Sequence, residues 1–380
     1  IVWPQKSGIT LRGEDKNTTI IDGEQSYRIF ELGVDMDAGL DAAGAYDVGE
    51  IYVDTNENGL WDSSSGYVED YFNIYETQDN PTIENFTLTK GYISGGHGGA
   101  FYIYSISNLN LNNVDMILNN AVGSTSVAGA MYINASTVNI LHSTIADNNA
   151  GCSGAEYSSG GGAIYMPSSN VTLTRCLLYD NDIANGAGTA IYLTRGTTNP
   201  VLTLDHTTIA AHSGNAIYSQ DLSPASNTMT IKNSILWDAA VYIYSTAGPT
   251  SYSYSNYSGS VLSGTGNISS DPLFTYPEIH DYNLQWGSPC INSANPDNDG
   301  DGLDYTQDLD DRDPDGTRMD MGVFPFDAGD HVFGCMDPLA SNYSEDADIE
   351  DESCEYESNY ALEFDGVDDY VEIAYNSIFT

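Results

Sequence analysis

The sequence predicts an all-β chain whose main domain is a right-handed parallel β-helix with three short strands per coil. A phrase of alanine, one apolar residue and tyrosine occurs six times, with successive tyrosines 30, 33, 27, 26 and 24 residues apart. Two further apolar pairs follow each of the first five copies, and Gly, Asn and Ser separate these segments. Such short segments with turn residues between them are typical of strands. Because one repeat cannot bury its own apolar face, the copies must stack as coils.

The repeated phrase predicts the first strand of each coil. Side chains alternate across a strand, so the residue before each tyrosine points inward and the tyrosine points outward. The interior residues are then Phe101, Met131, Ile164, Ile191, Ile217 and Val241. The outward column is Tyr102, Tyr132, Tyr165, Tyr192, Tyr218 and Tyr242. It is a candidate glycan-binding or partner face, but we favour a self-stacking ladder because six uncovered rings would be an unusual patch.

The second and third strands are predicted by shorter patterns. Alternation, as at Val138 and Ile140, marks the second strand, and an apolar pair such as Leu177-Leu178 marks the third. Polar residues recur where these strands end, and we expect them to form ladders that satisfy the backbone of the turns. The row after the second strand is Asn113, His142, Arg175, His206 and Asn233. The row after the third strand is Asn119, Asp147, Asp180, Ala211 and Asp238.

The repeats and composition shifts divide the chain into a β-helix and smaller parts. We assign residues 1–32 and 81–294 to the β-helix, 33–80 to an acidic insertion, 295–330 to an Asp-rich terminal coil or cap, 331–358 to a two-cysteine linker module, and 359–380 to strand segments. The last coil would otherwise expose an open strand edge, so a cap is required. We expect the stretches 287–292 and 315–322 to close it.

The composition excludes several classes of partner. The 380 residues include ten Lys plus Arg against 55 Asp plus Glu, a net charge of −45. This charge disfavours nucleic acid and anionic membranes and favours bound cations. No run of about 18 apolar residues is present, so we predict no membrane span. Abundant Gly and Tyr with scarce Lys indicate a secreted or cell-surface β-protein, and residues 1–4 read as mid-strand, so we expect a piece of a longer protein.

Two acidic loops have the residue spacing of calcium-binding loops. In the first, oxygen ligands fall at positions 1, 3, 5 and 12 and Gly302 falls at position 6, an arrangement that suits Ca²⁺. Its ligands are Asp297, Asp299, Asp301, the Leu303 carbonyl and Asp308. The second loop repeats the front half with Asp54, Asn56, Asn58, the Leu60 carbonyl and Asp62, but Ser65 stands at position 12. The sequence therefore predicts Ca²⁺ as a cofactor, the alternative being solvated acidic turns.

Several stretches resemble known families. Residues 9–13 and 19–23 resemble the first turns of pectate-lyase-like β-helices, and the Gly-Gly-Ala-Ile-Tyr phrase at 161–165 is similar to repeats of secreted bacterial β-helix surface proteins. This resemblance covers roughly residues 1–327 and implies a secreted β-helix. Residues 334–354 are similar to a small two-cysteine module of secreted bacterial proteins, and 360–371 resemble the start of a laminin-G or concanavalin-like domain.

The cysteines predict one disulfide. Cys335 and Cys354 are expected to pair, because the small acidic module between them has little core of its own. Cys152 and Cys176 lie about one coil apart and either pair or stay separate, and Cys290 is the odd cysteine.

These features together favour a non-catalytic structural or adhesive protein stabilised by calcium. Self-association into an extracellular filament, with residues 360–374 docking on a neighbouring subunit, is one expectation. The alternatives are a carbohydrate-active enzyme, either a polysaccharide lyase or a glycosidase, and a glycan-binding module. The resemblance implies that a lyase would cluster Lys or Arg beside calcium-binding Asp. However, Lys90, Arg175, Arg195 and Lys232 are the only basic residues between 81 and 290, and the carboxylates Asp147 and Asp180 stand at ladder positions.

Overall fold

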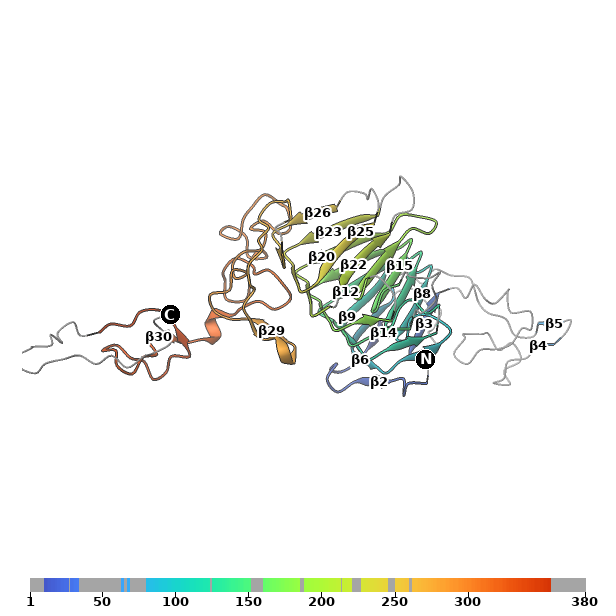
Figure 1. The fold of residues 1–380 in the computed structure, drawn as a ribbon, viewed down its shortest axis with the longest axis horizontal. Helices are drawn as coiled ribbons and strands as arrows, with labels where there is room; N and C mark the ends of the chain where they lie inside the picture. Colours follow the sequence, from blue (N-terminus) through green and yellow to red (C-terminus); the bar gives the residue numbers. More distant parts are fainter. Residues whose placement is uncertain are drawn as a thin grey trace, which may run out of the picture. The chain divides into compact units, whose positions relative to one another are not determined.

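The computed structural model describes most of the repeat region and the segment that follows it (Figure 1). The described residues are 10–26, 28–33, 63–64, 67–68, 80–123, 125–151, 160–184, 188–212, 214–220, 227–244, 250–259 and 262–356. The chain forms two compact units, Ile1–Phe326 and Asp327–Thr380. In the described part of the chain, no helix is long and apolar enough to cross a membrane.

The first unit is a right-handed parallel β-helix, as predicted. One sheet of seven strands carries the tyrosine phrase: β3 (Phe30–Gly33), β8 (Phe101–Tyr104), β11 (Met131–Asn134), β15 (Ile164–Pro167), β19 (Ile191–Thr194), β22 (Asn215–Gln220) and β25 (Ala240–Tyr244). Every neighbouring pair in it is parallel, and Tyr102, Tyr132, Tyr165, Tyr192, Tyr218 and Tyr242 stand in one register. The stacking predicted from the repeated phrase is therefore confirmed.

A second sheet of fourteen strands holds the other two predicted rows. The first row is β1 (Thr10–Arg12), β6 (Thr82–Thr89), β9 (Leu109–Ile117), β12 (Thr137–Leu141), β16 (Asn170–Thr174), β20 (Val201–Asp205), β23 (Thr228–Lys232) and β26 (Thr250–Ser253). The other is β2 (Ile20–Asp22), which pairs with the second half of β6, then β13 (Thr144–Ala146), β17 (Leu177–Tyr179), β21 (Thr208–Ala210), β24 (Ile235–Trp237) and β27 (Asn256–Tyr257). Strands β6 and β9 are long enough to serve both rows, since β9 pairs with β12 and with β13.

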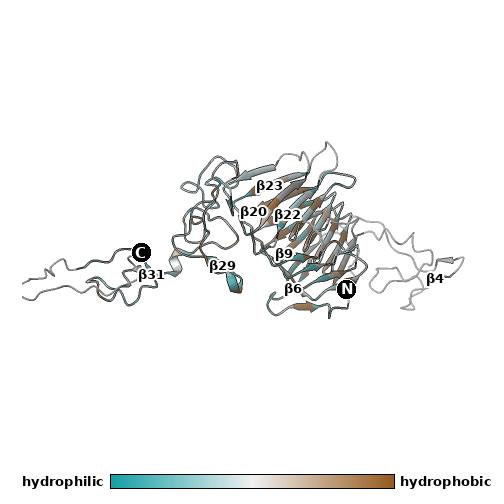
Figure 2. Ribbon diagram, viewed as in Figure 1, coloured by the Kyte–Doolittle hydropathy of each residue, from teal (hydrophilic) through white to brown (hydrophobic). Residues whose placement is uncertain are grey.

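The core lies inside the coils, where every second strand residue is apolar. The predicted interior side chains of Phe101, Met131, Ile164, Ile191 and Ile217 are completely buried, and Val241 packs against them while partly buried. Figure 2 shows the apolar stretches within the strand rows. Burial alternates along many of the strands, as in β11, β12 and β20, which confirms the period-two pattern there.

The structure also contains a row of short strands that the sequence did not predict. It consists of β7 (Tyr92–Ser94), β10 (Asn120–Val122), β14 (Asn149–Ala150) and β18 (Asp182–Ile183). Segments of two or three residues are too short to show a hydrophobic period, so the sequence pattern does not predict them. They follow a turn that the sequence placed one residue out of register. Ile145 pairs with Met116, so Asn119 aligns with Asn148 and not with Asp147.

The corrected register shows a ladder of buried amides at this turn. The members are Asn119, Asn148, Asn181 and His212, and all four are buried. The Nδ2 of Asn119 donates to Oδ1 of Asn148 at 3.0 Å, and the Nδ2 of Asn148 donates to Oδ1 of Asn181 at 2.9 Å. The Asn181 amide lies 3.4 Å from Nε2 of His212. The predicted Asp147, Asp180, Ala211 and Asp238 row is a separate one that starts at Leu118, and each of its residues has a positive φ.

Another buried row explains one of the cysteines. Ser143, Cys176, Thr207, Ser234 and Ser255 follow the corner residues in successive coils, and the Ser143 hydroxyl accepts from the Val114 amide at 2.9 Å. The thiol of Cys176 takes the hydroxyl's place and lies 3.4 Å from the carbonyl oxygens of Ile140 and Thr174. Cys176 and Cys290 are buried and unpaired with other cysteines, and Cys152 lies outside the described residues.

The end of the β-helix contacts a segment that was not predicted to lie there. Residues 262–270 lie along the last coil, where the Tyr254 amide donates to the Thr265 carbonyl and Tyr257 to that of Ile268. In the predicted stretch 287–292, Cys290 is buried, and its sulfur accepts from the Nδ2 of Asn256 in the last coil at 3.1 Å. The end of the stretch 315–322 instead lies beside preceding coils, where the Gly322 amide donates to the Asn233 carbonyl at 2.8 Å and that of Val323 to the Thr208 hydroxyl at 3.1 Å.

Several smaller elements complete the first unit. In the insertion, β4 (Ser63–Ser64) pairs with β5 (Tyr67–Val68). After the last coil, β28 (Phe274–Tyr276) and β29 (Asp281–Leu284) form an antiparallel hairpin with the 3₁₀ turn η2 (Pro277–Ile279) at its tip.

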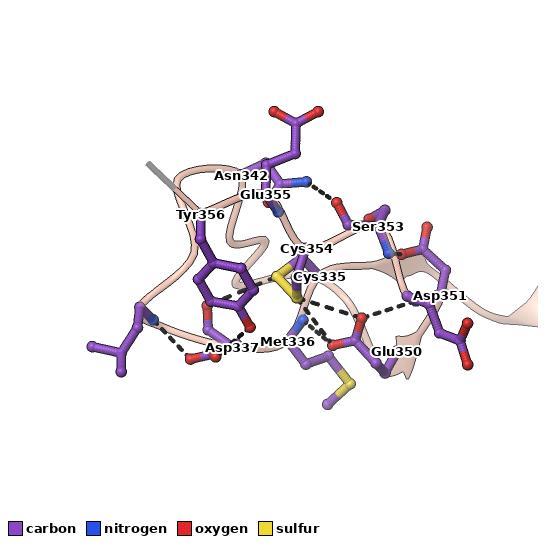
Figure 3. Close-up of a disulfide and its surroundings, with 12 residues drawn as sticks. Cys335, Met336, Asp337, Asn342, Glu350, Asp351, Ser353, Cys354, Glu355 and Tyr356 are labelled. Carbon is purple, nitrogen blue, oxygen red and sulfur yellow. Dashed lines mark hydrogen bonds between the residues drawn. A yellow bond between two sulfur atoms is a disulfide. The ribbon is translucent and has the colours of Figure 1, made fainter. Parts of the chain in front are cut away.

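The second unit is described to residue 356. It contains the 3₁₀ turn η3 (Ala328–Asp330) and a parallel pair, β30 (Phe333–Gly334) and β31 (Ile349–Glu350). A disulfide joins Cys335 and Cys354 (Figure 3). The Tyr356 hydroxyl donates to Asp337 at 2.7 Å, and the Glu350 carboxylate accepts from the Met336 amide at 2.7 Å. The strand segments expected at 359–380 lie outside the described residues.

Candidate functional site

The tyrosine column is a continuous ladder of stacked rings. The ring centroids are 5.0 Å apart from Tyr102 to Tyr132, 5.7 Å from Tyr132 to Tyr165, 5.5 Å from Tyr165 to Tyr192 and 5.1 Å from Tyr192 to Tyr218. The planes of neighbouring rings differ by 6° to 16°. Tyr242 continues the column in its backbone register, and its side chain lies outside the described ones.

The surroundings of the column cover its ring faces. The Arg28 guanidinium lies 4.9 Å from the centroid of Tyr102, and the His97 ring stacks on Tyr132 at 4.9 Å. Tyr192 is 1% exposed and its hydroxyl donates to Gln220 at 2.6 Å. A sugar that stacks on an aromatic ring needs a free ring face. Because rings within the ladder are stacked on both sides, this geometry suits a stabilising ladder better than a glycan platform.

The acidic loop at residues 297–311 is built on carboxylates that bond to the loop backbone. Asp297 accepts from the amides of Gly300 at 2.8 Å and Gly302 at 3.1 Å. Asp299 accepts from the Asp301 amide, and Asp301 from the Leu303 amide at 2.7 Å. These are the short-range bonds that fold a chain into a tight turn. They hold the predicted loop together through bonds between its own side chains and backbone.

The carboxylates of this loop meet in two groups that share Asp299. One group is Asp297, Asp299 and Asp311, and the other is Asp299, Asp308 and Asp310; within each group the candidate ligand oxygens lie within 4.8 Å of one another. Asp308, predicted at position 12, thus approaches Asp299 but belongs to the second group. Asp301 is in neither group. Sequence reasoning missed Asp310 and Asp311, because the twelve-residue template ends at Asp308.

Asp311 is the most informative residue of the loop. It is 1% exposed, and its Oδ1 accepts from the Asn298 amide at 2.7 Å. Its Oδ2 is buried and has no hydrogen-bond partner. A buried carboxylate oxygen without a partner is unfavourable unless a cation or donor neutralises it. The donor set, composed of carboxylate oxygens, is the kind that Ca²⁺ and Mg²⁺ prefer. These residues therefore suit a hard divalent cation.

The acidic loop is tied to the side of the β-helix. The Nδ2 of Asn233, a corner residue of the coil formed by β23 and β24, donates to Oδ1 of Asn298 at 2.8 Å. The Oδ1 of Asn233 accepts from the Asn295 amide at 2.8 Å. Any ion that rigidifies the loop would also hold the segment after it against the coils. The second predicted loop, with Asp54, Asn56, Asn58, Leu60 and Asp62, lies outside the described residues.

The residues considered for catalysis do not converge within the described part of the chain. Lys90 pairs with Asp22 at 2.6 Å, Arg175 with Asp313 at 3.6 Å, and Lys232 with Asp205 at 3.1 Å. Each pair sits at a different coil and joins neighbouring segments. Salt bridges of this kind hold structure together, and a base for a lyase would have to be freed from its partner first.

The acidic residues of the row after the third strand also interact with one another and with the rest of the fold. Burial raises the pKa of Asp147, and the neighbouring Asp180 raises it further. Asp180 in turn lies 3.5 Å from the His280 ring.

A cavity of about 650 Å³ collects several of the chain's few cations. Lys16, Arg175 and Arg312 line it, together with His142 and Asp313. The Lys16 ammonium is 3.0 Å from Asp115, and the Arg312 guanidinium donates to the carbonyls of the acidic loop. The cations therefore join the first coil, the side segment and the acidic loop, and their charges are already offset by carboxylates and carbonyls.

The comparison with known families agrees with this architecture. Residues 72–258 match the family model described as the right handed beta helix region. None of the curated proteins matches the chain. A match of this kind establishes the fold of that segment, whereas function must be argued from the sites.

Proposed function

We propose that this protein is a non-catalytic structural component of the extracellular space, a β-helix whose terminal acidic loop binds Ca²⁺. The observation that carries the proposal is the buried, unpartnered Oδ2 of Asp311 beside Asp297 and Asp299. Ca²⁺ takes six to eight oxygen ligands, and the two clusters of carboxylates that share Asp299 supply several of them. A cation there would offset carboxylate repulsion in a chain with a net charge of −45.

The expected effect of the ion is mechanical. Asn233 connects the loop to a coil corner, and Val323 connects the following segment to the coil of Thr208. Closing the loop around Ca²⁺ would hold this side segment in place over several coils. Binding to the folded state alone stabilises it by about 2.7 kcal/mol when the free ion is at 100 times its Kd.

Two features support an extracellular location. The disulfide between Cys335 and Cys354 is of a kind that persists in oxidising compartments. The ladders of tyrosine and asparagine link successive coils along the β-helix, an arrangement that suits a surface stalk, an adhesin or a filament subunit. The ion-paired state of Lys90, Arg175 and Lys232 does not favour the lyase alternative.

Thermal unfolding with and without calcium tests the ion. We expect EDTA to lower the melting temperature of the full chain, and millimolar Ca²⁺ to restore it more effectively than Mg²⁺, because the loop offers many oxygens in a flexible arrangement. Asp311→Asn should abolish most of this response. The matched control is Glu278→Gln, which removes one charge from an exposed residue at the hairpin tip. A melting temperature that changes neither with EDTA nor with Asp311→Asn would refute a structural ion at this loop.

Particle size tests the assembly. Electron microscopy of the full chain in Ca²⁺ should show elongated arrays if the protein builds filaments through its C-terminal residues. Truncation after Tyr356 should then leave single particles. Arrays that persist in the truncated protein would eliminate the docking of residues 360–374, and single particles of the full chain would eliminate the filament.

A further inference from the structure

A second pocket, of about 410 Å³, lies on the side of the β-helix beneath the β28–β29 hairpin. Its volume falls in the range of small-ligand sites. Ala210 and Ala211 form its base in the coil, Trp237 and Asp238 flank it, and the hairpin supplies Tyr282. Asp271 also lines the pocket. All of these residues belong to the first unit of the chain.

The pocket exists because one coil carries small residues where its neighbours carry large ones. Tyr179, Ala210 and Trp237 occupy one register on the adjacent strands β17, β21 and β24. The next position in each coil is Asp180, Ala211 and Asp238. Two coil spacings of about 4.8 Å separate the coils on either side. The missing ring at Ala210 therefore leaves a gap the width of one flat molecule beside Trp237.

The hairpin covers the gap without filling it. Its tip is held over the previous coil, where the His280 ring stacks on Tyr179 at 4.4 Å and lies 3.5 Å from Asp180. Tyr282 packs against Tyr179 with centroids 5.8 Å apart and against Phe274 at 5.1 Å. The hairpin is thus anchored by aromatic contacts on one side of the gap. Trp237 forms the other side and is half-buried.

One wall of the pocket has an unsatisfied polar group. Tyr282 is 2% exposed, and its hydroxyl is buried without a hydrogen-bond partner. Leaving such a group unpaired is unfavourable, so the pocket favours a molecule that brings a hydrogen-bond acceptor. Burial, together with nearby Asp180, raises the pKa of Tyr282, which keeps the hydroxyl protonated as a donor.

The charge of the pocket selects the class of ligand. Asp238 and Asp271 are exposed at its rim, and the described residues that line it include no lysine or arginine. Carboxylates accept hydrogen bonds and repel anions. A ligand that suits these walls has a flat apolar face for Trp237, several hydroxyl donors for the carboxylates, an acceptor for Tyr282, and no negative charge.

We propose that this pocket binds one residue of an uncharged glycan, a neutral pyranose stacked on Trp237 with its hydroxyls bonded to Asp238 and Asp271. An acidic sugar is excluded by the same carboxylates. The proposal does not depend on calcium or on filament formation. It would attach a structural rod to a neutral polysaccharide at a defined position along its side.

An array of immobilised oligosaccharides tests the proposal, with neutral hexose, N-acetylhexosamine and uronate members probed by the full chain in Ca²⁺ buffer. We expect neutral members to bind and uronate members not to bind. Trp237→Ala should weaken binding to the best neutral oligosaccharide at least tenfold. The matched control is Trp286→Ala, which removes a tryptophan that is 48% exposed and lies outside the pocket lining.

Two more variants keep the test decisive if Trp237→Ala does not fold. Ala210→Tyr places in the gap the side chain that the previous coil carries at this register, and should abolish binding. Asp271→Asn keeps one oxygen to accept from the Leu273 amide, and should weaken binding severalfold. The proposal is overturned if no neutral oligosaccharide binds, if uronates bind better, or if folded variants with a filled or truncated pocket bind like the unaltered chain.

Discussion

Replacing Asn148 by alanine should destabilise the β-helix more than almost any other asparagine substitution. The Asn148 side chain is fully buried, and its Oδ1 accepts from both the backbone amide of Asn119 at 2.9 Å and the Asn119 side chain at 3.0 Å. Its Nδ2 donates to the Met116 carbonyl at 2.9 Å and to Asn181 at 2.9 Å. An alanine would leave at least the Asn119 amide and the Met116 carbonyl without these partners. At about 1–3 kcal/mol for each buried group, the expected loss is roughly 2–6 kcal/mol.

Asn139→Ala in the same coil is the matched control. Asn139 also donates two side-chain bonds to asparagines of the previous coil, to Asn108 at 2.8 Å and to Asn110 at 3.0 Å. It is only half-buried on the outer face, where water replaces lost partners, so its removal should cost about 1 kcal/mol or less. Urea unfolding followed by circular dichroism in Ca²⁺ buffer measures both. Equal shifts of the midpoint would refute the argument that burial makes this ladder important.

Two further predictions concern the tyrosine ladder and pH. Tyr165→Leu removes two ring contacts and should lower the free energy of unfolding, measured in urea, by about 1–3 kcal/mol. Tyr165→Phe keeps both contacts and should lower it clearly less. Similar losses for the two variants would contradict ring stacking as the cause. Burial raises the pKa of Asp320 from 3.8 to about 6, so the folded state favours the protonated carboxyl. The stability that this protonation contributes is fully present below pH 3.8 and is lost as the pH rises through 6. Between pH 4 and 7 in EDTA the unaltered chain should therefore lose on the order of 2 kcal/mol more stability than Asp320→Asn, and parallel pH profiles would contradict this.

The coils were predictable because one phrase repeats with few changes. The residues before the tyrosines, such as Phe101 and Ile164, are all interior. They must share one side of the sheet, because shifting a strand's register by one residue would move all of its side chains to the opposite face. The corner row of Asn113, His142 and Arg175 followed from the same count. The turn after the third strand did not, because Asn119 could be aligned with Asp147 or Asn148 and only the backbone pairing distinguishes them.

The candidate sites were less predictable, since they depend on contacts between distant segments. Asp297 and Asp299 were found from their spacing alone. Asp311 lies beyond the twelve-residue template, and what distinguishes it from its acidic neighbours is burial, which a sequence does not display. The pocket beneath the hairpin depends on both the alignment of Ala210 with Tyr179 and the position of the β28–β29 hairpin. The alignment followed from the row that holds Asp180 and Ala211, whereas the position of the hairpin could not be read from residue patterns.

The alanines at 210 and 211 have an electrostatic consequence beyond the pocket they open. Carboxylates at one corner of consecutive coils lie about 5 Å apart, where two charges repel by roughly 3 kcal/mol at an effective dielectric constant of 20. Burial raises the pKa of Asp147, and repulsion from the neighbouring Asp180 adds to this shift. With Ala211 between Asp180 and Asp238, the spacing doubles and the repulsion falls by half. Ala211→Asp should therefore lower stability at pH 7 more than at pH 4, and an unchanged pH profile would show that solvent already screens this row.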